Sequence, residues 1–348
     1  MDLSERQLKI LQAVISDFVN TAEPVGSRSL SKNHDLGVSP ATIRNEMSDL
    51  EEMGYLTHPH TSAGRVPSEK AYRLYVNQLM NKHEVADDLK LAISSQFSRS
   101  MNEFEKTIQH AAHILSEITN LTSFALTPKQ DDDMLKYINL LPVDERTVVL
   151  MIVSESGKVQ NTALRINAPY TEEGLTLLAK TLTYNYRGKT ISQALTGDII
   201  DSFENDFDAM MSGLAQNIMP DFMKTLEEML NVNLYMDGLT NIFSLPEYNS
   251  DIEKAKSFLE MMNAKEAFTQ KLIARDDGMV ITIGNENADE NMSDYSMITA
   301  TYHVDGKLIG KLGVIGPTRM KYSEVTSVIQ YLTDNISNTF KIGEDDND

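Results

Sequence analysis

The sequence predicts an α+β protein in which a helical N-terminal segment precedes a longer region of alternating strands and helices. Its 348 residues are enough for two or three domains. Residues 1–80 carry 8 Lys+Arg against 10 Asp+Glu, a net charge of −2, and the other residues hold −18 of the total of −20. Beyond residue 134, apolar segments with strand composition alternate with stretches of helical periodicity. These contrasts indicate a near-neutral N-terminal domain joined to acidic domains of mixed structure.

The composition excludes several classes of protein. The chain has no cysteine, which rules out disulfides, thiolate nucleophiles and cysteine-ligated zinc. The first residues, MDLSERQLKILQ, are charged where a secretion signal has an apolar core. No apolar run approaches the roughly 18 residues of a membrane span. We therefore expect a soluble, cytoplasmic protein without a membrane partner.

Two helices are predicted near the N-terminus. Ser4 is placed to cap the first, and Leu8, Leu11 and Ile15 follow at helical spacing. Pro24 ends this helix, because proline disfavours the helical conformation of the residue before it. A short second helix over SRSLSKNH leads into the turn DLGVS.

The third helix has the features of a helix that reads DNA. Ser39 caps it and Pro40 takes its first position, where the missing N–H costs little. Ile43, Met47 and Leu50 form its buried stripe. Small or hydrogen-bonding side chains that can reach base edges and phosphates occupy the opposite face. They are Ala41, Arg44, Asn45 and Ser48.

A small hairpin is predicted after the third helix. Gly54 ends the helix, YLTHPH has strand character, TSAG is a turn and RVP is the returning strand. Three helices followed by a hairpin make a winged helix-turn-helix, which we interpret as a DNA-binding domain. A structural or protein-binding winged helix remains an alternative. His58 and His60 have the spacing of a metal-binding pair, although two histidines without a third ligand are more typical of a surface.

A helical segment after residue 80 has two interpretations. Its apolar residues follow one another in steps of four and three, which is a heptad seam. They are Phe97, Met101, Phe104, Ile108, Ala111, Leu115 and Ile118. The seam suits a coiled coil between two chains or a helix packed on its own domain. The small and apolar flanking residues favour the second interpretation.

Strands are predicted in two separated regions. MLKYINLLPV and RTVVLMIVSESGKVQNTALRI come first, the latter as two strands joined by the turn SESGK. GMVITIG, MITATYHV and KLIGKLGVIGP come later, with Asp305-Gly306 as a hairpin turn between the last two. SEVTSVIQYLTDNISNTF is a closing helix. The tail GEDDND has the composition of a disordered segment.

A methionine-rich stretch of helical character lies between the two strand regions. Methionine packs adaptably and is also overused at contact surfaces, so an ordinary core and a dimer interface are both consistent with it. The residues are Met210, Met211, Met219, Met223, Met229 and Met236.

The sequence contains no recognisable catalytic constellation. The Walker pattern and G-x-S-x-G are both absent, and no cysteine nucleophile exists. Gly306, Gly310, Gly313 and Gly316 lie in a predicted strand hairpin, where they permit close packing or bulges. We therefore expect no enzyme activity, no metal site and no cofactor.

Three long blocks of the sequence resemble a known family. They are LSERQLKILQAVISDFVNTAEPVGSRSL, VSPATIRNEMSDLEEMGYLTHPHTSAGRVPSEKAYRLYV and GKLIGKLGVIGPTRMKYSEV, and they resemble HrcA, the heat-inducible transcription repressor of bacteria. The resemblance implies a dimer that binds double-stranded DNA at an inverted repeat, the CIRCE element, upstream of chaperone operons. It implies repression at normal temperature and a GroE chaperonin that keeps the repressor active.

The resemblance also implies an architecture. It comprises a winged helix at 1–80, a linker or helix at 81–104, and a GAF-like α/β sheet domain formed by 105–166 and 250–343. A mixed α+β dimerisation domain is inserted at 167–249, and an acidic tail follows at 344–348.

The DNA contacts expected from this framework are of two kinds. Arg44, Asn45 and Ser48 would read bases. Arg28, Lys32, Arg65 and Arg73 would hold phosphates. The expected DNA-contacting set is completed by Ser39, Ala41, Thr42, His60 and Ser62.

The leading hypothesis is therefore a dimeric transcription repressor that loses activity on heat stress. An alternative is a winged-helix regulator whose GAF-like domain senses a small metabolite. A third hypothesis is an enzyme or scaffold that uses the winged helix for protein contacts.

Overall fold

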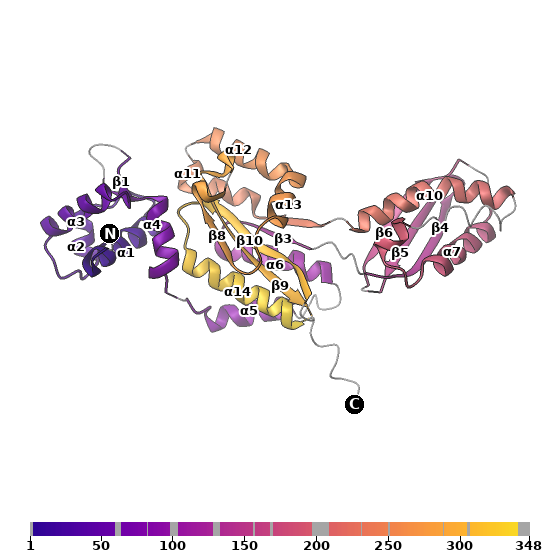
Figure 1. Cartoon of the computed structure of the whole chain (residues 1–348), viewed down its shortest axis with the longest axis horizontal. Helices are drawn as coiled ribbons and strands as arrows, with labels where there is room; N and C mark the ends of the chain where they lie inside the picture. Colours follow the sequence, from indigo (N-terminus) through magenta and orange to yellow (C-terminus); the bar gives the residue numbers. More distant parts are fainter. Residues whose placement is uncertain are drawn as a thin grey trace, which may run out of the picture. The chain divides into compact units, whose positions relative to one another are not determined.

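The chain folds into two compact units, which the computed structural model in Figure 1 shows with their labelled elements. One unit combines Met1–Thr127 with Asn233–Asp348, and the other is Pro128–Val232. None of the helices in the described ranges has the length and apolar character needed to span a bilayer. The structure describes residues 3–59, 64–81, 83–97, 104–127, 133–155, 157–167, 170–196, 209–230, 232–249, 251–287, 289–304 and 307–339.

The first 80 residues form the expected winged helix-turn-helix. Its elements are α1 (Glu5–Thr21), α2 (Ser27–Asn33), α3 (Pro40–Glu52), β1 (Leu56–Thr57), β2 (Val66–Pro67), α4 (Glu69–Leu74) and the π-helical turn η1 (Tyr75–Leu79). Ser4 caps α1 through a capping box with Gln7. The apolar stripes of the three helices meet in one core, in which Leu11, Leu30 and Ile43 are fully buried.

A five-stranded antiparallel sheet forms the centre of the rest of the first unit. Its order is β7-β3-β10-β9-β8. The strands are β3 (Thr122–Leu126), β7 (Leu234–Asp237), β8 (Val280–Ile283), β9 (Tyr295–Val304) and β10 (Lys307–Pro317). All the strands predicted after residue 230 are therefore confirmed. We call this part of the first unit the sheet domain.

Helices cover both faces of the sheet (Figure 1). On one face, α6 (Phe104–Thr119) and α14 (Tyr322–Thr339) contact β3, β9 and β10, with α5 (Asp87–Phe97) beside α6. On the other, Phe268 of α13 (Lys265–Ile273) packs edge-on against Phe124 of β3. Further short elements complete this side: α11 (Pro246–Asn249), α12 (Ile252–Asn263), and the 3-10 turns η2 (Leu239–Ser244), η3 (Gly284–Asn287) and η4 (Glu290–Met292).

The heptad seam packs on its own domain over the residues described. Ile108, Ala111 and Leu115 are buried in the core shared with α14 and the sheet. Met101 lies outside the described residues. The glycines of β10 permit close packing, as expected: a Cβ on Gly313 would lie 2.7 Å from the Phe124 ring, and Gly310 sits at a register shift. Gly306 lies outside the described residues.

The second unit has its own sheet and helices. Strands β4 (Leu135–Asp144), β5 (Thr147–Ser154) and β6 (Val159–Arg165) form a three-stranded antiparallel sheet. The helices are α7 (Glu172–Tyr186), α8 (Ile191–Thr196) and α10 (Ala209–Leu230). Their buried faces close one core around Leu150, Leu178 and Phe222.

The boundaries of this unit differ from the expected ones. The strands over 135–165 were expected in the GAF-like sheet, but they pair only with one another among the described strands. Residues 234–237 fall within the expected insert at 167–249, yet the strand Leu234–Asp237 pairs with β3. The inserted unit is therefore residues 128–232 and not 167–249. Met219 and Met229 lie in its core, so these two methionines pack internally.

Candidate nucleic-acid interface

The recognition helix α3 is built as its sequence indicates. The Ser39 hydroxyl accepts a hydrogen bond from the Thr42 backbone N–H at 3.2 Å, which satisfies one of the unpaired donors at the helix start. Ile43, Met47 and Leu50 are buried. Side chains on the opposite side are consequently left at the surface. Of these, Ala41, Arg44 and Asn45 are exposed and Ser48 is half-buried.

The cations of α2 and α3 form no ion pair with an acidic residue that the structure describes. Arg28 and Lys32 of α2 are exposed, as is Arg44 of α3. None of the three forms an ion pair with a described residue. The turn between the helices contains Gly37 at φ +65°, a conformation that glycine adopts without strain. The structure therefore brings these three expected DNA-contacting cations together on one helix-turn-helix motif.

Two acidic residues of α3 bond basic side chains of the same domain. Glu46 is buried and accepts from Arg6 Nε at 2.6 Å. Glu51 pairs with Arg65 Nε at 2.7 Å and with His58. These contacts neutralise carboxylates that would otherwise repel phosphate. They also show His58 in an ion pair. Among the described residues no group of three potential ligands is placed to hold a metal ion.

The base of the wing is held by backbone pairing. Leu56 and Thr57 pair with Pro67 and Val66, and the Arg65 backbone bonds Val25 in both directions at 2.8 and 2.9 Å. A Cβ on Gly64 would lie 2.5 Å from the Val25 carbonyl oxygen, so this close approach requires glycine. His60 and Ser62 of the expected wing tip lie outside the described residues.

Arg73 is engaged within the protein. Its Nε donates to Glu286 Oε1 at 2.8 Å, and its Nη2 donates to Glu286 Oε2 and, at 2.7 Å, to the Ile281 carbonyl. Glu286 belongs to η3, in the sheet domain. These bonds favour a role in holding the winged helix to the sheet domain over the expected phosphate contact.

Further contacts join the same two parts. Arg319 donates to the Val19 carbonyl of α1 at 2.6 Å while it pairs with Glu247. Glu69 accepts from the Asn285 side chain at 3.1 Å. Sequence reasoning missed these residues, because the partners lie more than 200 positions apart and no local pattern marks them.

The electrostatics of the Arg73–Glu286 pair favour the ionised carboxylate. Burial alone would raise the pKa of Glu286, but the hydrogen bonds from Arg73 and from the Ile283 N–H outweigh it and lower that pKa. The same pair raises the pKa of Arg73, chiefly through its hydrogen bond to Glu286. The contact is therefore charged at neutral pH.

Comparison with known proteins places this geometry in a family. The family model of the HrcA protein C-terminal domain matches residues 105–326. The heat-inducible transcription repressor HrcA of Alkaliphilus metalliredigens is 42% identical over 342 residues, which cover 98% of this chain and 99% of that protein. The chain belongs to the HrcA family. HrcA of Clostridioides difficile is 41% identical and covers 96% of this chain and 98% of its own. Repression of heat-shock genes is accordingly the function of this chain.

The HrcA fold is also found in a solved structure. A crystal structure of a hypothetical protein at 2.2 Å resolution has a TM-score of 0.71 to this chain at 23% identity. It covers 98% of this chain and 99% of the other. The whole arrangement of a winged helix, a sheet domain and an inserted unit therefore recurs outside this sequence.

Proposed function

We propose that this HrcA chain represses chaperone operons by binding, as a homodimer, a double-stranded inverted repeat of the CIRCE type in the cytoplasm. The exposed face of α3 carries the proposal. Arg44 and Asn45 stand free of ion pairs with described residues on a capped helix, whose N-terminal dipole favours phosphate. Both side chains can bond base edges in a major groove.

The proposed contacts divide by chemistry. Arg44, Asn45 and Ser48 read bases, supported by the close approach that Ala41 permits. Arg28 and Lys32 hold phosphates. Arg65 contributes from the wing with the part of its guanidinium that Glu51 leaves free, and Arg73 is assigned to the sheet domain instead. One winged helix contacts few base pairs, so useful specificity requires two half-sites and hence a two-fold dimer.

The second unit is the proposed dimer contact. Large apolar side chains stand exposed on β4 and α7, with Tyr184 at 87% and Val143 at 63% exposure. Tyr137 of β4 and Tyr184 of α7 line one common depression. Apolar surface of this kind typically marks a protein contact. Tyr184→Asp should convert the dimer to a monomer in light scattering, whereas Leu91→Asp, at an exposed position in α5, should not. If the Tyr184→Asp variant remains a dimer, the dimer contact lies on another surface.

Operator binding is tested with a fluorescently labelled duplex. The intact chain should bind an inverted repeat at least tenfold more tightly than a duplex carrying one half-site. Arg44→Ala should lose this preference, and Arg165→Ala, an exposed arginine of the second unit, should keep it. Equal binding of all duplexes would refute sequence-specific repression.

The GroE chaperonin is the proposed factor that maintains activity, as membership of the HrcA family suggests. After mild heating, operator binding should return faster and more completely with GroE and ATP than with ATP alone. Recovery that is identical in both conditions would refute the chaperonin's role and leave the DNA-binding proposal intact.

A second function, small-molecule sensing, is favoured by a cavity in the sheet domain.

A further inference from the structure

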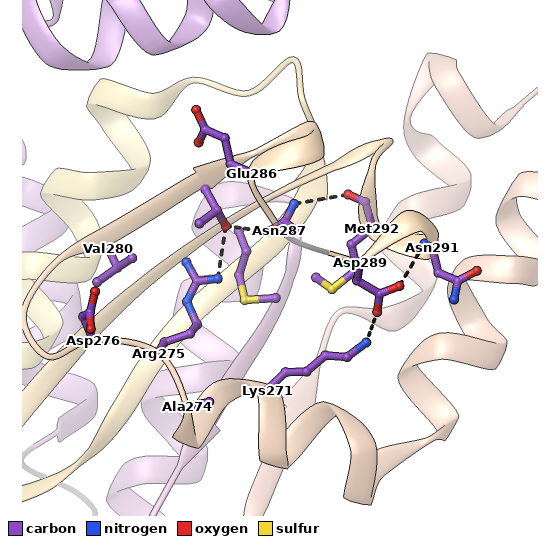
Figure 2. A pocket seen from close by; sticks show the side chains of 12 residues that line it. Lys271, Ala274, Arg275, Asp276, Val280, Glu286, Asn287, Asp289, Asn291 and Met292 are labelled. Carbon is purple, nitrogen blue, oxygen red and sulfur yellow. Dashed lines mark hydrogen bonds and ion pairs between the residues drawn. The ribbon is translucent and has the colours of Figure 1, made fainter.

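A cavity of about 740 Å³ lies in the sheet domain, and Glu286 and Asn287 of η3 belong to its lining. This volume is within the usual range of small-molecule pockets, roughly 300–1,000 Å³. Figure 2 shows its lining, with Arg275 on one side and Lys271 with Asp289 on the other. Its walls come from the end of α13, from β8 and β9, and from the turns η3 and η4.

Arg275 is a partly buried cation that forms no ion pair with any carboxylate in the described part of the chain. Its Nε donates to the Thr299 hydroxyl at 3.2 Å, and its Nη1 donates to the Thr282 hydroxyl at 3.1 Å. Its Nη2 is buried and has no hydrogen-bond partner, and no described carboxylate lies within ion-pair distance of the guanidinium. Burial accordingly lowers the pKa of Arg275. A buried, unsatisfied guanidinium is costly in a native protein and calls for a partner.

Three other charged residues of the lining already form ion pairs. Lys271 pairs with Asp289, and Glu286 pairs with Arg73. Asp276 is exposed and makes no ion pair with Arg275. Asp276 acts on Arg275 only through space, and Arg275 is therefore the one cation of the lining that forms no ion pair with a described carboxylate.

We propose that this cavity binds a small organic monocarboxylate, whose carboxylate bonds the free Nη2 of Arg275 and whose apolar body lies against Met292, Met297 and Val280. A guanidinium edge matches a carboxylate in geometry and charge. One cation that forms no ion pair with a described carboxylate suits one negative charge, and the acids at the rim disfavour a multiply charged phosphate ligand. The side-chain amide of Asn291 supplies a further donor.

The same wall of the cavity holds the DNA-binding domain. Thr282, which accepts from Arg275, donates to Asn287 of η3. Glu286 in η3 holds Arg73, and Asn285 bonds Glu69 of α4. A carboxylate bound to Arg275 would thus affect the position of η3, the short segment whose residues bond the winged helix. This regulatory consequence, unlike the binding itself, rests on the proposed repressor function, and we expect occupancy to change operator affinity.

Calorimetric titration of the intact chain with hexanoate and with benzoate tests the site. At least one of the two acids should bind saturably with one site per chain. The corresponding neutral amides, hexanamide and benzamide, should not bind, because they lack the charge. Arg275→Gln should weaken binding roughly tenfold or more. Ala274→Phe, which fills the cavity and leaves Arg275 unchanged, should also abolish binding. Arg319→Gln, which alters an arginine elsewhere in the same unit, should leave it unchanged.

Each outcome decides one part of the proposal. No binding of either acid at 20 mM (roughly the weakest affinity of use to a sensor), equal binding of the amides, or unchanged binding by Arg275→Gln would overturn the site. Binding of inorganic phosphate in place of the acids would overturn the monocarboxylate assignment. Acid binding without any change in operator affinity would refute the coupling to DNA binding and support the binding site. Acid binding by a chain that binds no operator would instead refute the proposed repressor function.

Discussion

Replacing Arg73 by methionine separates two roles for this side chain, holding the winged helix to the sheet domain and binding DNA phosphate. Methionine keeps the aliphatic contact and loses the bonds to Glu286 and to the Ile281 carbonyl. A hydrogen bond between charged groups contributes about 1.5–3 kcal/mol when well shielded. The two side chains are 30% and 35% exposed, and solvent screening reduces the expected loss to about 1–2 kcal/mol.

A double-mutant cycle measures the pair itself. Arg73→Met, Glu286→Gln and the double variant would be unfolded in urea, and the free energies of unfolding compared. Because the two groups bond each other, we expect a coupling energy of about 1 kcal/mol. Both single variants should leave the salt dependence of operator binding unchanged.

A phosphate contact would behave differently. Loss of a phosphate-binding cation reduces the slope of log affinity against log salt by about one. Glu286→Gln would not reproduce this change, because it removes no cation. A reduced slope in Arg73→Met alone, together with a coupling energy near zero, would refute the structural role of the pair.

Four other predictions follow from the same domain. Arg44→Ala should weaken operator binding by about 1–3 kcal/mol and relax base preference, and an equal loss on all sequences in anisotropy titrations would contradict base reading. Gly64→Ala should lower operator affinity with unchanged helical circular dichroism, because its Cβ would lie 2.5 Å from a carbonyl oxygen, and retained affinity would show that the wing can shift. The stabilisation from ionised Glu286 should be complete above pH 4.5, the ordinary pKa, and vanish as pH falls through its lowered folded value. The difference in unfolding free energy between wild type and Glu286→Gln should therefore close in acid, and a constant difference would contradict the assignment. The salt slope of operator binding should be no steeper than about −7, since each of two protomers offers Arg65 of the wing and three cations on α2 and α3 that pair with no described acid. A steeper slope would require cations from elsewhere.

The winged helix could be predicted from sequence because its signals are local. Ser39, Pro40 and the stripe at Ile43, Met47 and Leu50 all lie within 12 residues, so capping and periodicity specify the helix directly. Most of the strands were predicted for the same reason, although β3 (Thr122–Leu126) was not. Their sheets were not, because alternation shows that a segment is a strand and does not show its partner. The strand at 234–237 pairs with β3, more than 100 residues earlier.

The charged contacts were misjudged for a related reason. Arg73 lies on α4 between Tyr72 and Leu74, and nothing near it in the sequence distinguishes a phosphate ligand from an internal partner. Its carboxylate is 213 residues away. Arg275 lies in RDDG, where two adjacent acids suggest a compensated surface charge, yet the fold turns the guanidinium inward and leaves both acids exposed.

The net charge of −20 is compatible with DNA binding because of which charges are paired. Arg6 and Arg65 bond Glu46 and Glu51, so these acids of α3 contribute little repulsion at the helix-turn-helix surface. The cations of α2 and α3 pair with no described acid, so three positive charges remain available to phosphate although the domain carries −2 in sum. So few cations give weak non-specific affinity. In the proposed dimer, tight binding would then come from base contacts made at both half-sites.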